Sequence, residues 1–188
     1  MTRIISGFAG SLTLTVPRSG TRPTSDRVRE AIFSSLESHD ELAGARVLDL
    51  YAGSGSLGLE AASRGAASVT LVENGKTAAD ACRKNAASVL KNAPRAGGLT
   101  IEVAGSAVQA FLTGSAATWD VVFLDPPYEL SNGELVENLV ALVPRLSADA
   151  VVLLERSSRD AEPDWPAGLE LEKRKNYGDT TLWWVARV

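Results

Sequence analysis

The sequence predicts a doubly wound, Rossmann-like α/β fold with a mostly parallel sheet. Short apolar runs alternate with segments of helical periodicity over most of the 188 residues, and this alternation is typical of parallel strands covered by helices on both faces. A glycine-rich loop follows the first apolar run and opens a helix, as in folds that bind a nucleotide at the carboxyl ends of their strands. The last two apolar runs are too close together for a crossover helix, so we expect them to pair antiparallel at one edge.

The individual elements follow from the period of the apolar residues. The expected strands are 46–51, 68–73, 99–103, 120–124, 150–155, 169–173 and 181–188. Helices are expected between these strands, through 57–62, to about residue 90, over 108–112 and over 135–143. A further helix precedes the first strand, because Thr24 or Ser25 can cap it and apolar residues then recur at helical spacing from Val28 to Leu36.

The N-terminus is expected to form an extension of its own. Residues 1–20 alternate weakly between apolar and polar and are interrupted by glycine and proline. This pattern predicts a β-hairpin built from residues 4–5 and 12–16. Residues 21–188 then form the single domain that carries the chemistry.

Positive charge is concentrated at the N-terminus. The first 30 residues contain five arginines and two acids, a local charge of +3, whereas the whole chain carries −4. Phosphate contacts need local rather than overall positive charge. We therefore expect the N-terminal arm to bind RNA, with Arg3, Arg18 and Arg27 as contacts. A solvated surface of mixed charge is the alternative.

The remaining composition argues against several classes of protein. There is no apolar run of about 18 or more residues, so no membrane-spanning helix is expected. The N-terminus lacks the apolar core of a secretory signal. The single cysteine, Cys82, excludes an internal disulfide and a cysteine-based metal cluster. We expect a cytoplasmic monomer that needs no metal, with Cys82 as a small core residue.

The loop after the first strand has the spacing of a nucleoside-binding motif. Gly53, Gly55 and Gly58 form the pattern G-x-G-x-x-G, in which glycines take positive φ and let the backbone approach a ligand. Glu73 ends the second strand twenty residues after Gly53, placed to accept hydrogen bonds from ribose hydroxyls. The order of these features predicts a nucleoside site, and an NAD-dependent oxidoreductase fits it as well.

Two further features favour S-adenosylmethionine over a dinucleotide. Asp49 lies inside the first strand, where its carboxylate would repel a pyrophosphate but suits an amine and a sulfonium. Asp125-Pro126-Pro127-Tyr128 follows the fourth strand, and its two prolines make the turn stiff. The carboxylate of Asp125 and the carbonyl of Pro126 can accept both N–H bonds of a planar amine, while Tyr128 stacks on the base. Strands one and four are neighbours at the switch point, so the two halves are expected to face one crevice.

Several longer motifs resemble one family of class I methyltransferases. They are residues 3–7, 21–33, 47–55, 125–128 and 176–180, and together they span nearly the whole chain. On these residues the sequence resembles the RsmD family, bacterial methyltransferases that act on the N2 amine of a guanine in 16S ribosomal RNA. The Arg-Pro-Thr segment joined to a Val-Arg-Glu-Ala helix is the most specific piece. The resemblance implies a seven-stranded sheet with its last strand antiparallel, S-adenosylmethionine as methyl donor, and 16S rRNA or the 30S subunit as partner.

The site residues expected on this basis fall into two groups. The cofactor-binding group is Asp49, Gly53, Ser54, Gly55, Glu73, Ser106, Arg22 and Thr24. Within it, Glu73 holds the ribose, Asp49 orients the amino acid, and Arg22 with Thr24 closes over the cofactor's carboxylate. Ser106 stands where many methyltransferases place an Asp for the adenine amine. The catalytic group is Asp125, Pro126, Pro127 and Tyr128.

Other functions remain open from the residues alone. A DNA adenine-N6 methyltransferase shares the Asp-Pro-Pro-Tyr turn, but this chain has no obvious domain for recognising duplex DNA. A protein glutamine methyltransferase would also use this type of turn. An NAD-dependent oxidoreductase gives no role to Asp125 or Tyr128. A non-catalytic RNA-binding module leaves the glycine loop and Glu73 without a purpose.

Overall fold

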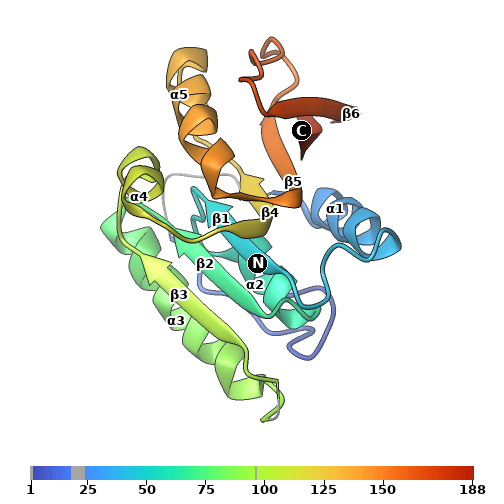
Figure 1. The fold of residues 1–188 in the computed structure, drawn as a ribbon. Helices are drawn as coiled ribbons and strands as arrows, with labels where there is room; N and C mark the ends of the chain where they lie inside the picture. Colours follow the sequence, from blue (N-terminus) through green and yellow to red (C-terminus); the bar gives the residue numbers. More distant parts are fainter. Residues whose placement is uncertain (1, 18–23, 96) are drawn as a thin grey trace.

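The computed structural model describes residues 2–17, 24–95 and 97–188. Within them lies a seven-stranded sheet with the order β3-β2-β1-β4-β5-β7-β6 (Figure 1). The strands are β1 (Arg46–Leu50), β2 (Ser68–Val72), β3 (Thr100–Ala104), β4 (Trp119–Leu124), β5 (Leu146–Ser157), β6 (Leu169–Tyr177) and β7 (Thr180–Arg187). Strands β1 to β5 are parallel, and β7 is antiparallel to both of its neighbours. The predicted mostly parallel sheet with an antiparallel last strand is confirmed.

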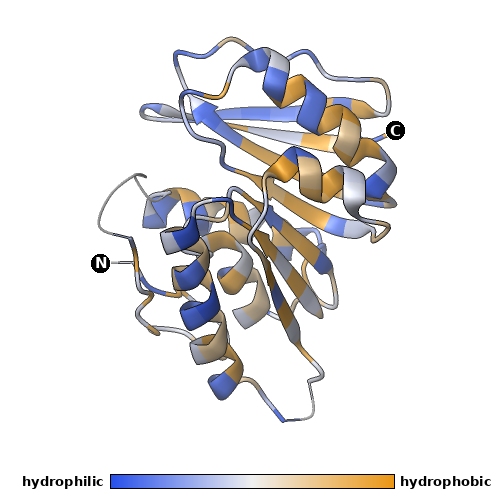
Figure 2. Ribbon diagram, turned by 90° about the vertical axis from the view of Figure 1, so that its left-hand side faces the viewer, coloured by the Kyte–Doolittle hydropathy of each residue, from blue (hydrophilic) through white to orange (hydrophobic). Residues whose placement is uncertain are grey.

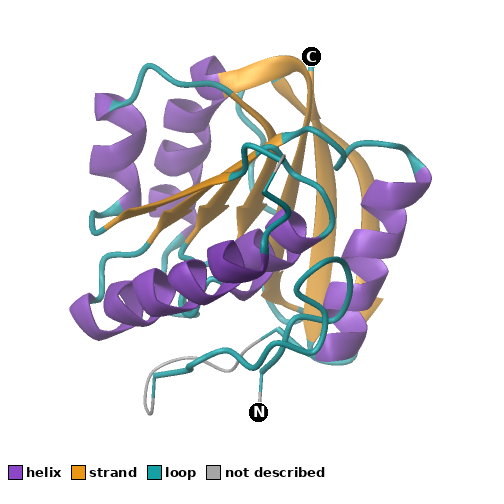
Figure 3. Ribbon diagram, turned by 90° about the horizontal axis from the view of Figure 1, so that it is seen from below, coloured by secondary structure: helices purple, strands orange, loops and turns teal. Residues whose placement is uncertain are grey.

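Helices cover both faces of this sheet (Figure 3). They are α1 (Asp26–Ser38), α2 (Ser56–Ser63), α3 (Lys76–Asn92), α4 (Val108–Gly114) and α5 (Asn132–Leu142), with a 3-10 turn, η1 (Val143–Arg145), after α5. Ser25 caps α1 by accepting the N–H of Val28 at 3.3 Å. The hydroxyl of Thr24, the other cap that the sequence allows, is therefore free for contacts elsewhere.

Alternate strand residues point to opposite faces and build two apolar layers. Val47 and Phe123 belong to the layer that packs against α1, α2 and α3, whereas Leu48 and Val122 belong to the layer under α4 and α5. Figure 2 shows hydrophobic residues gathered along the central strands. Packing on both sides fixes the strand ends, where ligands bind in sheets of this kind.

Strands β5 and β6 are longer than predicted. Strand β5 begins at Leu146, and β6 continues to Tyr177, which pairs with Thr180 of β7. The end of β6 was missed because Lys173-Arg174-Lys175 has no alternation of apolar and polar residues, which is the signal used to predict strands. An edge strand needs no such alternation, and charged side chains along it prevent pairing with other chains.

The N-terminal segment folds back on itself as predicted, but the pairing is too short to form regular strands. Arg3 and Thr13 form an isolated antiparallel bridge, and residues 2–17 contain no regular strand. Ile4 and Leu14 are buried in the layer that contains α2. The predicted hairpin is therefore present as a short pairing, in which the N–H groups of Ile4 and Leu14 donate to the carbonyls of Leu12 and Thr2, each at 2.9 Å. Much of the segment's backbone bonds to helix α2, to which Ile5, Ser6, Phe8 and Ala9 all donate.

Close packing and a buried acid hold this segment on α2. Gly7 has a φ of +81°, and a Cβ there would lie 1.8 Å from the carbonyl oxygen of Ser63. Glu60 is fully buried and accepts the N–H groups of Ile5 at 2.6 Å and Ser6 at 3.0 Å. Arg64 donates to the same carboxylate at 2.7 Å. These donors satisfy a charge that would be costly to bury alone.

The N-terminal segment is also joined to the glycine loop. The buried Asn85 of α3 accepts the N–H of Thr15 at 2.8 Å and donates to its carbonyl at 2.9 Å. The same amide nitrogen donates to the carbonyl of Ser54 at 2.9 Å. Hydrogen bonds through Asn85 therefore connect the glycine loop to the N-terminal segment, which is distant from it in the sequence.

Among the described residues, no helix combines the length and apolar character needed to cross a bilayer.

Candidate active site

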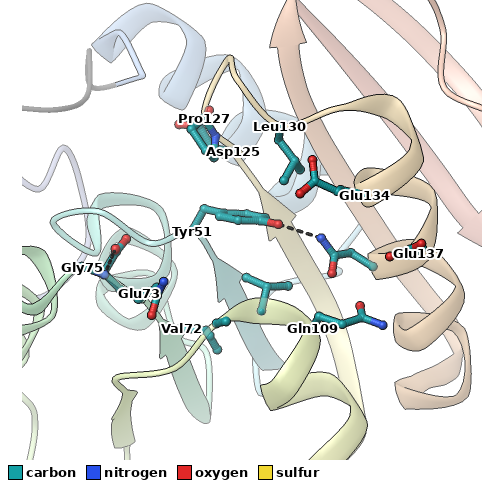
Figure 4. Close-up of a pocket in the computed structure, with 14 residues that line it drawn as sticks. Tyr51, Val72, Glu73, Gly75, Gln109, Asp125, Pro127, Leu130, Glu134 and Glu137 are labelled. Carbon is teal, nitrogen blue, oxygen red and sulfur yellow. Dashed lines mark hydrogen bonds between the residues drawn. The ribbon is translucent and has the colours of Figure 1, made fainter.

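A cavity of about 570 Å³ opens at the carboxyl ends of β1, β2 and β4 (Figure 4). Its walls come from these strand ends, from the first turn of α4 and from α5. It is lined by Tyr51, Val72, Glu73, Asn74, Gly75, Ala107, Val108, Gln109, Asp125, Pro127, Leu130, Glu134, Glu137 and Asn138. Glu73 and Asp125, which the sequence assigns to different halves of the reaction, therefore face one cavity.

Positive φ angles turn the chain sharply out of β1. Tyr51 has a φ of +62°, Gly53 of +58° and Gly55 of +79°, which is a strained conformation for a tyrosine. Helix α2 then begins directly after Gly55. At Gly58 a Cβ would lie 2.4 Å from a methyl group of Leu71, so only glycine lets α2 pack this closely on β2. The motif thus serves both the turn and the helix–sheet packing.

Glu73 is fixed in position by backbone donors. Its Oε2 accepts the N–H of Gly53 at 2.9 Å, and its Oε1 accepts the N–H of Gly75 at 2.7 Å. Each carboxylate oxygen can accept a second hydrogen bond. The side chain is therefore oriented and still able to accept two hydroxyl hydrogens from the cavity, which is what a ribose requires.

Three of the residues expected at the cofactor are not among those that line the cavity. Asp49 is buried and accepts the N–H of Gly58 at 2.9 Å; burial raises its pKa to about 7, although that hydrogen bond opposes the shift. Ser54 is buried with its carbonyl bonded to Asn85. The Ser106 hydroxyl donates to the carbonyl of Ala107 at 3.2 Å. In these positions Asp49 and Ser54 shape the glycine loop, and their direct cofactor contacts stay predictions, as does that of Ser106.

Cys82 lies under the same loop. Its thiol donates to the carbonyl of Gly53 at 3.2 Å, and burial raises its pKa to about 12, so the thiol is protonated at neutral pH. The prediction of a small core residue is confirmed. No group of three or more His, Cys, Asp or Glu side chains within the described ranges is arranged to bind a metal ion.

The Asp-Pro-Pro-Tyr turn follows β4 directly. The N–H of Asp125 points to the carbonyl of Leu50 at 3.5 Å, which places the turn beside the end of β1. Pro126 is buried, Pro127 lines the cavity, and Tyr128 is 67% exposed. A ring this exposed contributes little to the core and is available to stack on a ligand.

Thr24 contacts the acceptor half of the site. Its hydroxyl lies 3.3 Å from Oδ2 of Asp125 and 3.0 Å from Oε2 of Glu155. Burial raises the pKa of Asp125 well above its ordinary value, and the charge of Glu155 raises it further. Burial likewise raises the pKa of Glu155. A third carboxylate would be repelled here, so these contacts favour a role for Thr24 beside Asp125 rather than at the cofactor's carboxylate.

The expected RNA contacts are partly described. Arg18 lies outside the described residues, as does Arg22, which was expected at the cofactor's carboxylate. Arg3 has an exposed side chain, while its carbonyl accepts a hydrogen bond from Arg29 at 2.8 Å. Arg27 is exposed at a hollow of about 300 Å³ that Tyr177 also lines.

Several cavity residues were not found from the sequence. The Tyr51 hydroxyl accepts a hydrogen bond from Asn138 of α5 at 2.7 Å, and burial raises the pKa of Tyr51 to about 12 (Figure 4). Gln109 enters from the first turn of α4, and Glu134 and Glu137 from α5. One available signal is Asn138, a buried polar residue on an otherwise apolar helix face. The others are ordinary surface residues in the sequence and meet only in the fold.

One family of known proteins matches the chain over residues 2–186; its model is described as conserved hypothetical protein 95. Ribosomal RNA small subunit methyltransferase D of Escherichia coli K12 is 36% identical over 177 residues, which cover 94% of this chain and 85% of that protein. The protein of the same name from Haemophilus influenzae is 35% identical over 179 residues, covering 94% of this chain and 89% of that protein. The chain belongs to this family.

Membership of the RsmD family, predicted from the five motifs, is thereby confirmed. The solved structure of the methyltransferase yhhF from Escherichia coli matches with a TM-score of 0.84 and 34% identity, covering 99% of this chain and 97% of that one. Magnesium protoporphyrin IX methyltransferase of Synechocystis, solved with S-adenosylmethionine, matches with a TM-score of 0.66 over 90% of this chain and 87% of that one, and at 15% identity it shows the fold alone. The RsmD-family chain has the fold of class I methyltransferases.

Proposed function

We propose that this protein transfers the methyl group of S-adenosylmethionine to the exocyclic N2 amine of a guanine in 16S ribosomal RNA. The observation that carries the proposal is the single cavity onto which both Glu73 and Asp125 open. An oxidoreductase would not need Asp125. An RNA-binding module would need neither Glu73 nor Asp125. The two relatives named as small subunit ribosomal RNA methyltransferases support ribosomal RNA as the acceptor.

The cavity offers groups that fit the cofactor. The two oxygens of Glu73 can accept the ribose hydroxyls, as its fixed orientation suggests. Val72 and Val108 supply apolar surface for the adenine, and the Gln109 amide can both donate and accept at its polar edge. The bound cofactor supplies an electrophilic methyl group on a positively charged sulfur. Positioning this group in line with the amine provides much of the acceleration.

The acceptor side of the cavity acts on the amine. The nitrogen is a poor nucleophile because its lone pair is delocalised into the guanine ring. Asp125 and the carbonyl of Pro126 accept its hydrogens, which favours a pyramidal nitrogen and stabilises the positive charge that develops during attack. Tyr128 stacks on the base, worth about 1–3 kcal/mol in single-strand binders. The base must leave its stack to reach this position.

Replacing Glu73 with alanine should weaken cofactor binding by about 10- to 100-fold. A hydrogen bond to a charged group contributes about 1.5–3 kcal/mol, and each 1.4 kcal/mol is about tenfold in affinity. Calorimetry with S-adenosylmethionine measures the change. Glu102→Ala, which removes an exposed carboxylate from the neighbouring strand β3, is the matched control. Equal affinities for wild type and Glu73→Ala would contradict the ribose assignment.

The RNA is proposed to pass over a group of cations beside Tyr177. Lys175 lies 5.1 Å from the centre of the Tyr177 ring, and Lys173 lies 5.1 Å from the ring of Trp184. Arg27 borders the hollow next to Tyr177. Phosphates need local positive charge, which this group supplies on an acidic protein.

Replacing Lys173 and Lys175 together with alanine should lower RNA affinity and its salt dependence. Each lost phosphate contact is expected to reduce the slope of log K against log salt concentration by about 0.7–1. Filter binding with 16S rRNA at several salt concentrations measures the slope. Lys91→Ala is the control, because this exposed lysine lies in the last turn of α3, at the opposite edge of the sheet. An unchanged slope in the double variant would remove these cations from the RNA path.

The function itself is tested by supplying labelled S-adenosylmethionine with naked 16S rRNA, 30S subunits, DNA or free protein. We expect label in one of the RNA substrates and, after nuclease digestion and mass spectrometry, in N2-methylguanosine. Label in adenine of DNA would instead support the adenine-N6 alternative. Label in glutamine of a protein would support a protein glutamine methyltransferase.

A further inference from the structure

A second cavity, of about 220 Å³, lies on the other side of the Asp-Pro-Pro-Tyr turn. It is lined by Thr24, Ser25, Val28, Tyr128, Glu155, Tyr177, Gly178, Asp179 and Thr180. Two aromatic rings, the carboxyl groups of Glu155 and Asp179, and a tight turn therefore surround a space beside the Asp-Pro-Pro-Tyr turn. The proposed reaction gives no role to Glu155 or to the turn between β6 and β7.

Glu155 and Asp125 occupy equivalent positions on adjacent strands. Leu124 of β4 is paired with Leu154 of β5 in parallel register, and the two acids are the next residues of their chains. Both side chains reach the Thr24 hydroxyl, at 3.3 Å for Asp125 and 3.0 Å for Glu155. The two carboxyl groups thus lie side by side, one facing the large cavity and the other facing the small one.

Hydroxyl groups near Glu155 occupy only some of the hydrogen-bond acceptor positions of its carboxylate. The Thr24 hydroxyl has one hydrogen to donate and cannot satisfy both acids. The nearby Thr180 hydroxyl favours the ionised form of Glu155 and so opposes part of the rise in its pKa that burial causes. A carboxylate has about four acceptor positions, so Glu155 keeps the ability to accept a hydrogen from a ligand.

The edge of guanine matches this pair of acids. Guanine presents N1–H directly beside its N2 amine, which gives three hydrogens on two neighbouring nitrogens. If the amine donates to Asp125 and the Pro126 carbonyl, N1–H faces the neighbouring acceptor, Glu155. Adenine presents an unprotonated N1 beside its amine, so its lone pair would face the carboxylate. Because the N1 of adenine and the Glu155 carboxylate are both hydrogen-bond acceptors, they repel each other, and this repulsion discriminates against adenine.

We propose that Glu155 accepts the N1–H of the target guanine, with the base held beside Tyr128 and Tyr177, and that this contact selects guanine over other bases with an exocyclic amine. The inference rests on the proposed function and adds the group that determines base specificity. It also gives the β6–β7 turn a role, because Tyr177 and Thr180 form the wall that holds Glu155 and the base.

The test uses 2-aminopurine, which keeps the N2 amine of guanine but has an unprotonated N1. The guanine that the mass spectrometry identifies is replaced by 2-aminopurine in 16S rRNA joined from two pieces, and the rRNA is assembled into 30S subunits if they are the substrate. Single-turnover methyl transfer is measured on both RNAs with wild type, with Glu155→Gln and with the control Glu129→Gln, an exposed acid that directly follows Tyr128 in the chain. Calorimetry with S-adenosylmethionine shows that each variant is folded.

Wild type and Glu129→Gln should methylate guanine about 10- to 100-fold faster than 2-aminopurine, the discrimination expected of one well-formed pair of base contacts. In Glu155→Gln the ratio should fall to within about threefold, because an amide can accept N1–H or donate to a bare N1. An equal ratio in wild type and Glu155→Gln would overturn the inference, as would a wild type without preference for guanine. The proposed function fails differently, by the absence of methyl transfer from wild type to guanine in any RNA.

Discussion

Replacing Asp125 with alanine should lower methyl transfer at least about 100-fold and leave cofactor binding largely intact. The loss is the usual size when one polar group directed at charge in the transition state is removed. Cofactor binding should persist because the glycine loop follows β1 and Glu73 follows β2, whereas the acceptor turn follows β4. Single-turnover kinetics and calorimetry with S-adenosylmethionine measure the two quantities separately. Normal turnover by Asp125→Ala would refute the role of this turn in holding the amine.

The same variant should be no less stable than wild type at neutral pH. The pKa of Asp125 is raised by burial and by the charge of Glu155, so the folded protein binds more protons than the unfolded chain above the ordinary pKa. Stability from this group is therefore lost as pH rises from the ordinary pKa through the raised one. In Asp125→Ala the group no longer titrates, so this loss of stability at neutral pH is absent. Glu129→Ala, on the same loop but exposed, should change neither activity nor stability and is the control.

Replacing Glu60 with alanine should lower the free energy of unfolding by about 3–5 kcal/mol, the usual cost of breaking a buried ion pair by removing one partner. The change leaves Arg29 buried, 3.8 Å from where the carboxylate was, and frees the N–H groups of Ile5 and Ser6. Urea unfolding followed by circular dichroism measures the loss. An effect below about 1 kcal/mol would mean that the N-terminal segment does not depend on this acid.

Glu37→Ala is the matched control for Glu60. It removes the other carboxylate that contacts Arg64, at 3.1 Å, but the Glu37 side chain is 47% exposed. Exposed ion pairs contribute only about 0–1 kcal/mol. A second readout links the segment to the site, because Asn85 connects Thr15 to Ser54 in the glycine loop. Glu60→Ala should therefore also weaken cofactor binding, whereas Glu37→Ala should not.

Local sequence signals were sufficient for most of the fold. Every strand of the sheet begins within four residues of its predicted start, because apolar runs of strand length with breaks between them are the signature of buried parallel strands. The prediction was incomplete where that signal is absent. The second half of β6 is a charged edge, and the N-terminal segment is stabilised by α2 and α3, contacts that no local pattern reveals.

The site was predictable to the extent that its residues lie in contiguous motifs. Glu73 and Asp125 were placed correctly on one cavity because each directly follows a strand of the sheet. The contact between Tyr51 and Asn138 joins residues 87 positions apart, and that between Thr24 and Glu155 joins residues 131 apart. Contacts between residues so far apart in the sequence are visible only in the fold, and one of them involves Glu155, the acid that is proposed to select the base.

The reversed direction of β7 brings a loop to the ligand-binding edge of the sheet in an unusual way. In a sheet of parallel strands alone, each new loop at the ligand edge requires a helix to bring the chain back. Because β7 runs the other way, β6 and β7 deliver the turn at Gly178 and Asp179 to that edge with no helix at all. Substitutions in this short hairpin can therefore reshape the acceptor cavity without moving β1 and β2. Evolution or design could exchange the nucleic-acid target of such an enzyme while keeping its methyl-donor site unchanged.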